Sequence, residues 1–249
     1  MRVFKRPLTA AVASQLLSLL VIVSAVYFLG GVSLALWQLL LIQGALAALI
    51  SRPFGMANWW LVLHLLLPLA IWLALSWQLS AWVYFTAFVI MLLIFWNSAG
   101  ERVPLYLSNQ TTWQALSDLL PEQQPFRFVD LGSGLAGTLN YLAQHHPQGE
   151  FVGVESAPLP MWLARYRCGQ QRNITLLQHD MWKLDLSQFD VVYCFLSPEP
   201  MPKIYVKARK EMRPGSLLIS NSFTVKGFEP DEVLELDDRR RTRLYLWRI

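Results

Sequence analysis

A glycine-rich segment is the part of the sequence best suited to approach a bound ligand. The residues Phe128–Gly137 read FVDLGSGLAG, an apolar run followed by Gly132, Gly134 and Gly137. Glycines permit a tight turn that brings backbone N–H groups against a ligand, because a Cβ atom would block that approach. Several nucleotide-binding folds share such a turn, so taken alone it is a weak signal.

Three acidic residues sharpen this interpretation, because each one lies at or just after the end of an expected strand. Asp130 stands before the first glycine, Glu155 ends the next strand, and Asp180 follows the third. The carboxyl ends of parallel strands share one edge of a sheet, where ligands bind in open α/β folds. At that edge Glu155 would accept hydrogen bonds from two ribose hydroxyls, and Asp180 would hold an adenine amino group. For each residue taken singly, capping of a loop is the alternative.

The place of Asp130 distinguishes between two adenosine-containing cofactors. Dinucleotide enzymes bind phosphates with a G-x-G-x-x-G turn. S-adenosylmethionine (SAM) has no phosphates, and its methionine ammonium group benefits from a nearby carboxylate, which favours SAM here. The expected cofactor-binding residues are Asp130, Gly132, Ser133, Gly134, Gly137, Glu155, Asp180 and Met181.

Alternating strands and helices are expected to position these residues. Such alternation predicts a parallel sheet with right-handed crossovers, and two final strands joined by a charged turn predict an antiparallel hairpin. We therefore expect a Rossmann-like α/β domain with a mostly parallel seven-stranded sheet and a terminal antiparallel hairpin. The expected strands are Phe126–Leu131, Glu150–Val154, Ile174–Gln178, Val191–Leu196, Ser216–Phe223, Val233–Leu236 and Arg243–Ile249. The expected helices are Thr138–Gln144, Leu159–Cys168 and Pro202–Met212.

The first hundred residues have a different character. Between Pro7 and Ala99 the only charged side chain is Arg52. A water-soluble domain needs a polar face, whereas a helix that crosses a bilayer needs about 20 apolar residues. We expect four transmembrane helices, at Leu8–Leu29, Val32–Ile50, Trp59–Leu75 and Ala81–Trp96. The predicted division is a transmembrane region at residues 1–99 and an α/β domain at residues 100–249.

Basic residues beside the apolar runs predict the orientation. Arg2, Lys5 and Arg6 precede the first run, Arg52 separates the second from the third, and Arg102 follows the fourth. With four crossings all five lie on one side, which the positive-inside rule makes the cytoplasm. We therefore expect a multi-pass protein of the bacterial inner membrane with both termini cytoplasmic.

Gln15, Gln43 and His64 are strong polar groups that lie within the apolar runs. An ionisable residue inside a membrane is a functional candidate. Pairing of the histidine with another side chain, in helices that only tether the domain, is the favoured alternative.

Several motifs resemble those of small class I lysine methyltransferases. The family includes archaeal and bacterial members and mitochondrial enzymes that modify the ATP synthase c subunit and the adenine nucleotide translocase. The resemblance covers about Val103–Ile249 and implies a class I fold, SAM as cofactor and a protein lysine as acceptor. Its motifs are the glycine turn, the Glu155 strand, Asp180–Lys183, Val191–Leu196 leading into Ser197–Pro200, and a pre-motif at Val103–Ser108.

The chain departs from the family pattern in two places. Ala136 occupies the position of the usual third glycine of the turn. The pre-motif has Tyr106, Leu107 and Asn109 where the family more often has smaller residues or proline.

Methyl transfer is an in-line displacement, so a protein mainly aligns the two partners and excludes water. We expect Ser197, with carbonyl groups around Leu196–Ser197, and Glu199 to orient the acceptor amine, while Tyr106 and Trp182 wall the site. The alternative for Glu199 is a carboxylate at the N-terminus of the following helix, where the helix dipole stabilises it. Tyr193 and Phe195 are expected in the core, and His179 is expected to be mostly structural.

Other kinds of site are not supported by the sequence. Cys168 and Cys194 have no paired spacing, and no metal-binding cluster is expected. The net charge of +4 owes much to the N-terminal basic residues and to Arg239–Arg241. That run has no aromatic platform, so it more simply caps a turn or faces phospholipid than binds nucleic acid.

The expected partners are therefore the lipid bilayer and a membrane-protein substrate, without nucleic acid or metal. Two other functions stay open at this point: methylation of a lipid or quinone, and a non-catalytic scaffold with a SAM fold.

Overall fold

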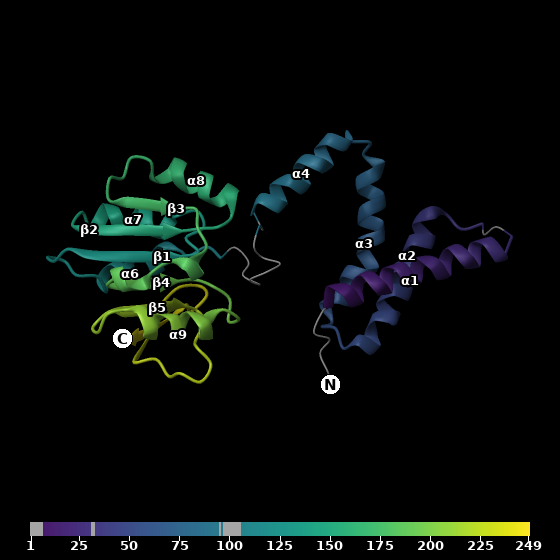
Figure 1. The fold of residues 1–249 in the computed structure, drawn as a ribbon. Helices are drawn as coiled ribbons and strands as arrows, with labels where there is room; N and C mark the ends of the chain where they lie inside the picture. Colours follow the sequence, from purple (N-terminus) through teal and green to yellow (C-terminus); the bar gives the residue numbers. More distant parts are fainter. Residues whose placement is uncertain (1–6, 31–32, 95, 97–105) are drawn as a thin grey trace. The chain divides into compact units, whose positions relative to one another are not determined.

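The computed structural model describes residues 7–30, 33–94, 96 and 106–249 (Figure 1). It contains two compact units, residues 1–84 and residues 85–249, which are treated separately below. The expected boundary between residues 99 and 100 lies outside the described residues, as do Arg2, Lys5, Arg6 and Arg102. The expected orientation in a membrane therefore stays a prediction.

The N-terminal unit is built of apolar helices. Three segments are long and apolar enough to cross a membrane: α1 (Pro7–Phe28), α2 (Leu36–Ser51) continued by the 3-10 helix η1 (Arg52–Phe54), and α3 (Trp59–Ser76). The fourth helix, α4 (Ala81–Ile94), has 14 residues and is shorter than such a span. The sequence thus identifies three candidate spans correctly, and a fourth crossing stays a prediction.

Polar side chains connect the first three helices. Gln43 Nε2 of α2 donates to Gln15 Oε1 of α1 at 2.8 Å and to Ser18 Oγ at 2.8 Å. Gln15 Nε2 in turn donates to the His64 carbonyl of α3 at 3.1 Å and lies 3.1 Å from His64 Nδ1. His64 is therefore paired, as the favoured alternative predicted. In an apolar environment such bonds fix which faces of the helices meet.

The C-terminal unit is a seven-stranded sheet with the order β3-β2-β1-β4-β5-β7-β6. Strands β1 to β5 run parallel, while β7 is antiparallel to both β5 and β6. This confirms the mostly parallel sheet and its terminal hairpin. The strands are β1 (Phe126–Leu131), β2 (Gly149–Val154), β3 (Ile174–Leu177), β4 (Val191–Cys194), β5 (Leu217–Asn221), β6 (Glu232–Glu235) and β7 (Arg243–Arg248).

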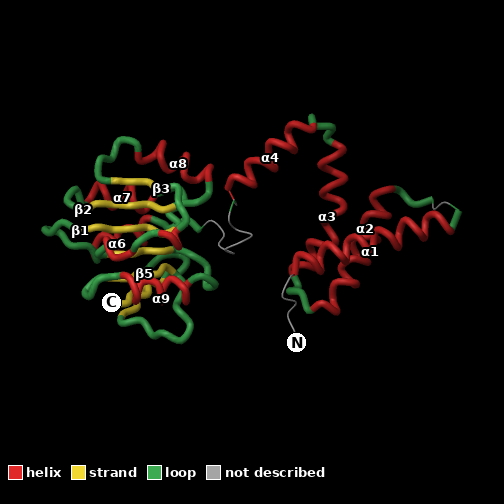
Figure 2. The backbone as a smooth tube through the Cα atoms, in the orientation of Figure 1, coloured by secondary structure: helices red, strands yellow, loops and turns green. Residues whose placement is uncertain are grey.

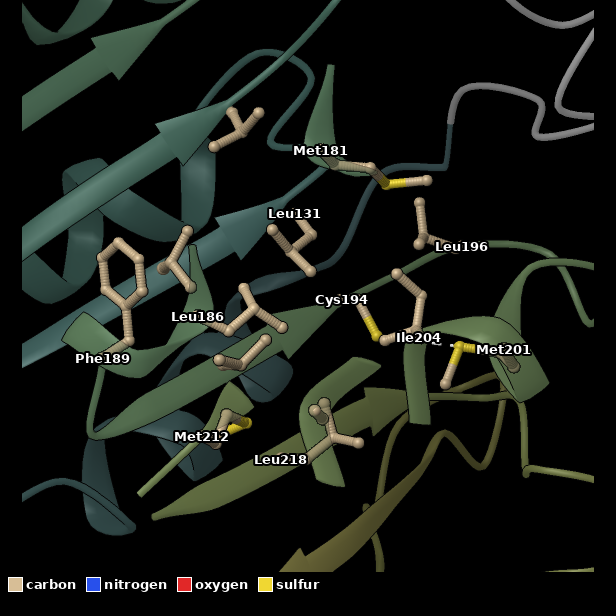
Figure 3. Packing of buried hydrophobic residues seen from close by; sticks show 14 of the residues in the cluster. Leu131, Met181, Leu186, Phe189, Cys194, Leu196, Met201, Ile204, Met212 and Leu218 are labelled. Carbon is tan, nitrogen blue, oxygen red and sulfur yellow. Dashed lines mark hydrogen bonds between the residues drawn. The ribbon is translucent and has the colours of Figure 1, made fainter. Parts of the chain in front are cut away.

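Helices cover both faces of this sheet (Figure 2). On one face Leu131, Cys194 and Leu218 of the strands pack against Met201 and Ile204 of α9 (Figure 3). On the other face the strands pack against α6, α7 and α8. The two cores separate because successive side chains of a strand point to opposite faces. The helices are α6 (Gln110–Asp118), α7 (Gly137–His145), α8 (Pro158–Cys168) and α9 (Met201–Glu211).

The element boundaries differ from expectation mainly after β3 and β4. Two short 3-10 helices, η2 (Met181–Lys183) and η3 (Leu186–Gln188), fill the segment between these strands. Strand β4 ends at Cys194 rather than at Leu196, because Val191–Cys194 alone pair with β1 and β5. Residues 195–197 are thereby released from the sheet at its carboxyl edge.

Candidate cofactor and acceptor site

The glycine turn is tied to the end of the neighbouring strand. Strands β1 and β2 are adjacent, and the backbone N–H groups of Gly132 and Ser133 both donate to the Val154 carbonyl, at 2.8 and 3.0 Å. Glu155 follows Val154 directly. The turn after β1 and the acidic residue after β2 are therefore held side by side at the carboxyl edge of the sheet.

Left-handed backbone conformations explain the residue types of this turn. Gly132 has φ 79° and Gly134 has φ 52°, values that glycine adopts without strain. At Gly132 a Cβ would also lie only 2.9 Å from Leu196 Cδ2. Ala136, where the family has its third glycine, takes φ 53° despite its Cβ. The alanine thus preserves the turn at a conformational cost of about 1 kcal/mol.

The Glu155 carboxylate closes the turn from the β2 side. Its Oε2 accepts from the Gly134 N–H at 3.0 Å, and its Oε1 accepts from the Ala157 N–H at 2.7 Å. Each oxygen thus receives one backbone bond, and an ionised carboxylate has about four acceptor positions in all. Glu155 keeps capacity for the hydroxyl groups of a ligand while it positions the turn.

Asp130 is a buried acidic group without a partner in the described part of the chain. It is 3% exposed, and no hydrogen bond reaches its carboxyl group from residues of the described ranges. Burial, and secondarily the charge of Glu155, raises the pKa of Asp130 to about 8. The buried Ser133 Oγ beside it likewise finds no partner there. Buried polar groups in this state are characteristic of a site that binds a polar ligand.

A cavity of about 210 Å³ lies beside Asp130. Five residues expected from the sequence line it, namely Tyr106, Asp130, Gly132, Ser133 and Gly137. The lining also includes residues that were not expected there: Leu107, Ser108, Trp113, Leu135, Thr138, Arg167, Tyr193 and Phe195.

Side chains from three separate elements meet at one wall of the cavity. Trp113 Nε1 of α6 donates to Ser108 Oγ at 2.8 Å, and Ser108 Oγ lies 3.0 Å from Thr138 Oγ1 of α7. A Cβ on Gly137 would come within 2.9 Å of the Trp113 ring and 3.3 Å of Arg167 Nη1. Close packing thus requires glycine at position 137. The local sequence does not predict that these side chains form one wall of the cavity.

An aromatic cluster forms another wall. Tyr106 stacks on Phe195 with ring centroids 5.0 Å apart, and its ring lies 5.5 Å from that of Phe223. Tyr193 contributes to the core, as expected, but it also lines the cavity, as does Phe195. The Tyr193 hydroxyl accepts from Asn221 Nδ2 at 2.9 Å, and burial raises its pKa.

The turn between β6 and β7 holds the segment that carries Tyr106. Asp238 accepts from the Thr242 backbone N–H at 2.8 Å, from Thr242 Oγ1 at 2.7 Å and from Asn109 Nδ2 at 2.6 Å, and these bonds, the first above all, lower the pKa of Asp238 to about 2. Arg240 Nη1 donates to the Leu107 carbonyl at 3.3 Å. Asp238 caps the turn, whereas the Arg240 side chain ties the turn to Leu107, so the two roles expected for the basic run stay predictions.

Seven expected site residues do not line the cavity, namely Gly134, Glu155, Asp180, Met181, Trp182, Ser197 and Glu199. Asp180 caps η2, where it accepts from the Trp182 N–H at 3.0 Å. Met181 is buried in the core on the α9 face, and Trp182 packs against the same core. Glu199 is exposed in the turn before α9, close to where the helix-dipole alternative places it.

Ser197 is nearer to the glycine turn. It is buried, and its Oγ has no hydrogen-bond partner within the ranges described. The preceding residue, Leu196, touches the turn at Gly132. Among the described residues no group of His, Cys, Asp and Glu side chains could hold a metal ion, and Cys168 and Cys194 are buried thiols.

Comparison with known proteins identifies the domain. Residues 130–232 match the ANTKMT methyltransferase domain family. A protein-lysine N-methyltransferase of Saccharolobus islandicus (strain REY15A) is 28% identical over 140 residues, which cover 55% of this chain and 87% of that protein. The C-terminal domain is a class I SAM-dependent methyltransferase.

Two further similarities agree with this assignment. The methyltransferase domain is 28% identical over 114 residues to the adenine nucleotide translocase lysine N-methyltransferase of Mus musculus, about half of whose length (49%) is covered. It also shares the fold of an RNA methyltransferase from Salinibacter ruber solved with S-adenosyl-L-homocysteine. That match has a TM-score of 0.52 and 23% identity, and it covers 58% of this chain and 94% of the other.

Proposed function

We propose that the chain is a membrane-anchored protein-lysine N-methyltransferase that modifies a membrane or membrane-associated protein. The names of the two relatives support lysine as the acceptor. The observation that carries the proposal is one cavity, lined both by the buried Asp130, which has no hydrogen-bond partner among the described residues, and by the stacked rings of Tyr106 and Phe195. Such a cavity combines an anionic group for a cationic cofactor with aromatic walls for an alkyl ammonium side chain.

The residues of the turn fit SAM. In this proposal Asp130 and Ser133 bind the methionine end, where an ammonium group would satisfy a carboxylate that has no partner among the described residues. The backbone at Gly132, Gly134 and Gly137 lies against the cofactor, since these positions leave no room for larger side chains or need a left-handed turn. Glu155 accepts from the ribose hydroxyls. The proposal retains Asp180 and Met181 as candidate adenine contacts.

The acceptor lysine is placed between the aromatic cluster and the segment after β4. Tyr106 and Phe195 would pack along its methylene chain. Carbonyl groups near Leu196–Ser197, the Ser197 hydroxyl and Glu199 would orient the amine. SAM supplies an activated methyl group on a sulfonium ion. The amine must arrive uncharged, and a desolvated aromatic site lowers a lysine pKa from its usual value of about 10.4.

The apolar helices support the anchoring. Three of them have the length and composition of membrane spans, and α4 would supply a fourth if the apolar run extends to Trp96. Four crossings place residues 1–99 in the bilayer region and the methyltransferase domain, residues 100–249, on the same side as the N-terminus. The positive-inside rule makes that side the cytoplasm, in a bacterial inner membrane.

The test is to supply methyl-labelled SAM to membranes that contain the full chain and to digest the labelled product completely. We expect labelled methyl-lysine, and no label with the Asp130→Asn variant. Label recovered only in lipid or quinone would reject a protein acceptor. Absence of SAM binding at millimolar concentration, with the fold intact, would reject catalysis and favour a scaffold.

A further inference from the structure

Helix α8 has two apolar faces, of which only one is covered. The inner face consists of Pro160, Met161, Ala164 and Cys168, which are buried against the domain. The outer face should therefore be polar in a domain surrounded by water. Instead, Trp162 is 63% exposed, Leu163 is 39% exposed and Tyr166 is 86% exposed.

These exposed residues form one stripe rather than a scatter. An α-helix advances by about 100° for each residue. On this spacing Leu159, Trp162, Leu163 and Tyr166 fall within an arc of about 100°, opposite the buried face. We call these four residues the outer stripe of α8. Single exposed apolar residues need no explanation, but a contiguous stripe with two large aromatic rings indicates a contact.

Charges flank the outer stripe on both sides. Arg165 lies on one side and Arg167 on the other, and α8 contains no acidic residue. The Arg167 guanidinium lies toward the cofactor cavity, near Gly137, whereas Arg165 is exposed beside the stripe. Trp and Tyr rings with basic neighbours are typical of a helix at the surface of an anionic bilayer, where rings enter the headgroup layer and arginines meet phosphates.

We propose that α8 docks the methyltransferase domain onto an anionic lipid bilayer through its outer stripe. The proposal commits to lipid because the face combines exposed indole and phenol rings with the positive charge of Arg165, which forms no ion pair with the described residues. It rests on the membrane anchoring proposed above, since apolar helices on the same chain would hold the domain near such a surface. It is independent of the acceptor that the domain methylates.

The experiment places the photo-crosslinker p-benzoylphenylalanine at Tyr166 in the full chain. The protein is reconstituted into vesicles of phosphatidylethanolamine and phosphatidylglycerol and irradiated. The matched control carries the same group at Lys210, which is exposed on α9, the helix that covers the opposite face of the sheet. We expect about tenfold more phospholipid adduct, detected by mass, from position 166 than from position 210.

Two variants report on the chemistry of the contact. Trp162→Ser and Arg165→Gln should each lower the adduct from position 166, the second by about fivefold and only when phosphatidylglycerol is present. Val206→Ser, which removes an exposed apolar residue of α9, should leave the adduct unchanged. If the substitution at Tyr166 prevents folding, as judged by loss of SAM binding, the crosslinker is placed at Trp162 instead.

Three outcomes would overturn the proposal. These are equal lipid adduct at positions 166 and 210, a crosslink from position 166 to a second copy of the chain, and a crosslink to another protein. Extraction of the chain from vesicles by alkaline carbonate would contradict the anchoring by apolar helices. The lipid adduct would still decide the role of α8 in that case, and the identity of the methylated product decides the proposed function.

Discussion

Polar groups are buried in both units of the molecule, but they are satisfied in different ways. In the N-terminal unit Gln15, Gln43 and Ser18 bond to one another, and Gln15 pairs with Nδ1 of His64. In the methyltransferase domain the buried carboxyl group of Asp130 and the Ser133 hydroxyl have no partner among the residues described. Groups that pair with each other hold helices together, whereas groups left unpaired around a cavity are available to a ligand. An unpaired buried atom is not by itself a sign of function, because His64 Nε2 and Trp247 Nε1 also have no partner among the described residues. The position of Asp130 and Ser133 at a cavity is what distinguishes them.

The largest expected effect follows from replacing the carboxyl group of Asp130. Asp130→Asn preserves the volume of the side chain but cannot carry the negative charge that an ammonium group requires. We expect the Kd for SAM to rise roughly 100-fold, about 3 kcal/mol, because the bond involves ionised groups. Isothermal titration of the purified full chain measures this. Asp185→Asn is the control, since Asp185 is exposed and caps η3. A rise of less than about threefold in the Kd for SAM of Asp130→Asn would contradict a role of Asp130 in binding the SAM ammonium.

The same variant should not weaken the fold. In the ligand-free protein the pKa of Asp130 is raised from 3.8 to about 8. A raised pKa stabilises the fold fully below the unfolded value, and this stability is lost as pH rises through the folded value. Asparagine does not ionise and therefore does not lose stability in this way. Near neutral pH, Asp130→Asn should unfold at an equal or higher temperature than the native chain. A lower melting temperature would indicate that Asp130 has a structural partner.

Cofactor binding by the native chain should depend on pH. Below about pH 8 the free Asp130 is mostly protonated, so a cationic ligand must displace a proton to bind its carboxylate. The Kd for SAM should therefore fall by about tenfold per unit between about pH 6 and about pH 7, where the ammonium of SAM stays mostly charged. The Asp130→Asn variant should lose this dependence. A flat profile in the native chain would place the SAM ammonium elsewhere.

A smaller effect is expected for Glu155→Gln. Both oxygens of Glu155 accept backbone N–H groups, from Gly134 and Ala157, and an amide would turn a donor toward one of them. We expect the Kd for SAM to rise about tenfold, since one hydrogen bond to a charged group is lost. Glu150→Gln is the control, because Glu150 is exposed and pairs with Arg127 at the other end of β2. Equal effects of the two substitutions would argue against a specific role for Glu155.

The smallest expected effect concerns the paired polar groups of the N-terminal unit. Gln43→Leu removes the bonds to Gln15 and Ser18 but leaves the cofactor cavity untouched. We expect a loss of about 1 kcal/mol in the stability of the N-terminal helices, since each of the two bonds contributes about 0.6 kcal/mol on average in membranes. The Kd for SAM should not change. Ser76→Ala, which removes only a bond within its own helix, is the control for stability. Altered SAM binding by Gln43→Leu would show that the polar groups of the N-terminal helices are not purely structural.

The parts predicted well from the sequence are those that depend on local patterns. The mostly parallel sheet, the terminal hairpin and the glycine turn follow from alternating apolar runs and from glycines that permit a tight turn. The sequence predicts the contribution of Glu155 to the site only in part. Its place after β2 was expected, but its bonds to Gly134 and Ala157 arise from the exact approach of two neighbouring loops.

The features of the site that the sequence does not predict depend on contacts between segments that lie far apart in the chain. Trp113, Thr138 and Arg167 come from three helices, and only packing of those helices on one face of the sheet brings them to the cavity. Asp180 stands at a strand end, as expected, yet it caps η2, because that 3-10 helix begins directly after it. A pattern of acidic residues at strand ends therefore locates the edge that binds ligand without specifying which side chains reach the cavity.

The bonds from Asp238 and Arg240 to Asn109 and Leu107 have a consequence for biosynthesis. A ribosome finishes the 106–109 segment long before it reaches the β6–β7 turn, so the nascent polypeptide cannot fix this wall early. This wall of the cavity is therefore completed only at the end of synthesis. Translation that stops before Asp238 would leave a product that lacks the wall and should not retain SAM.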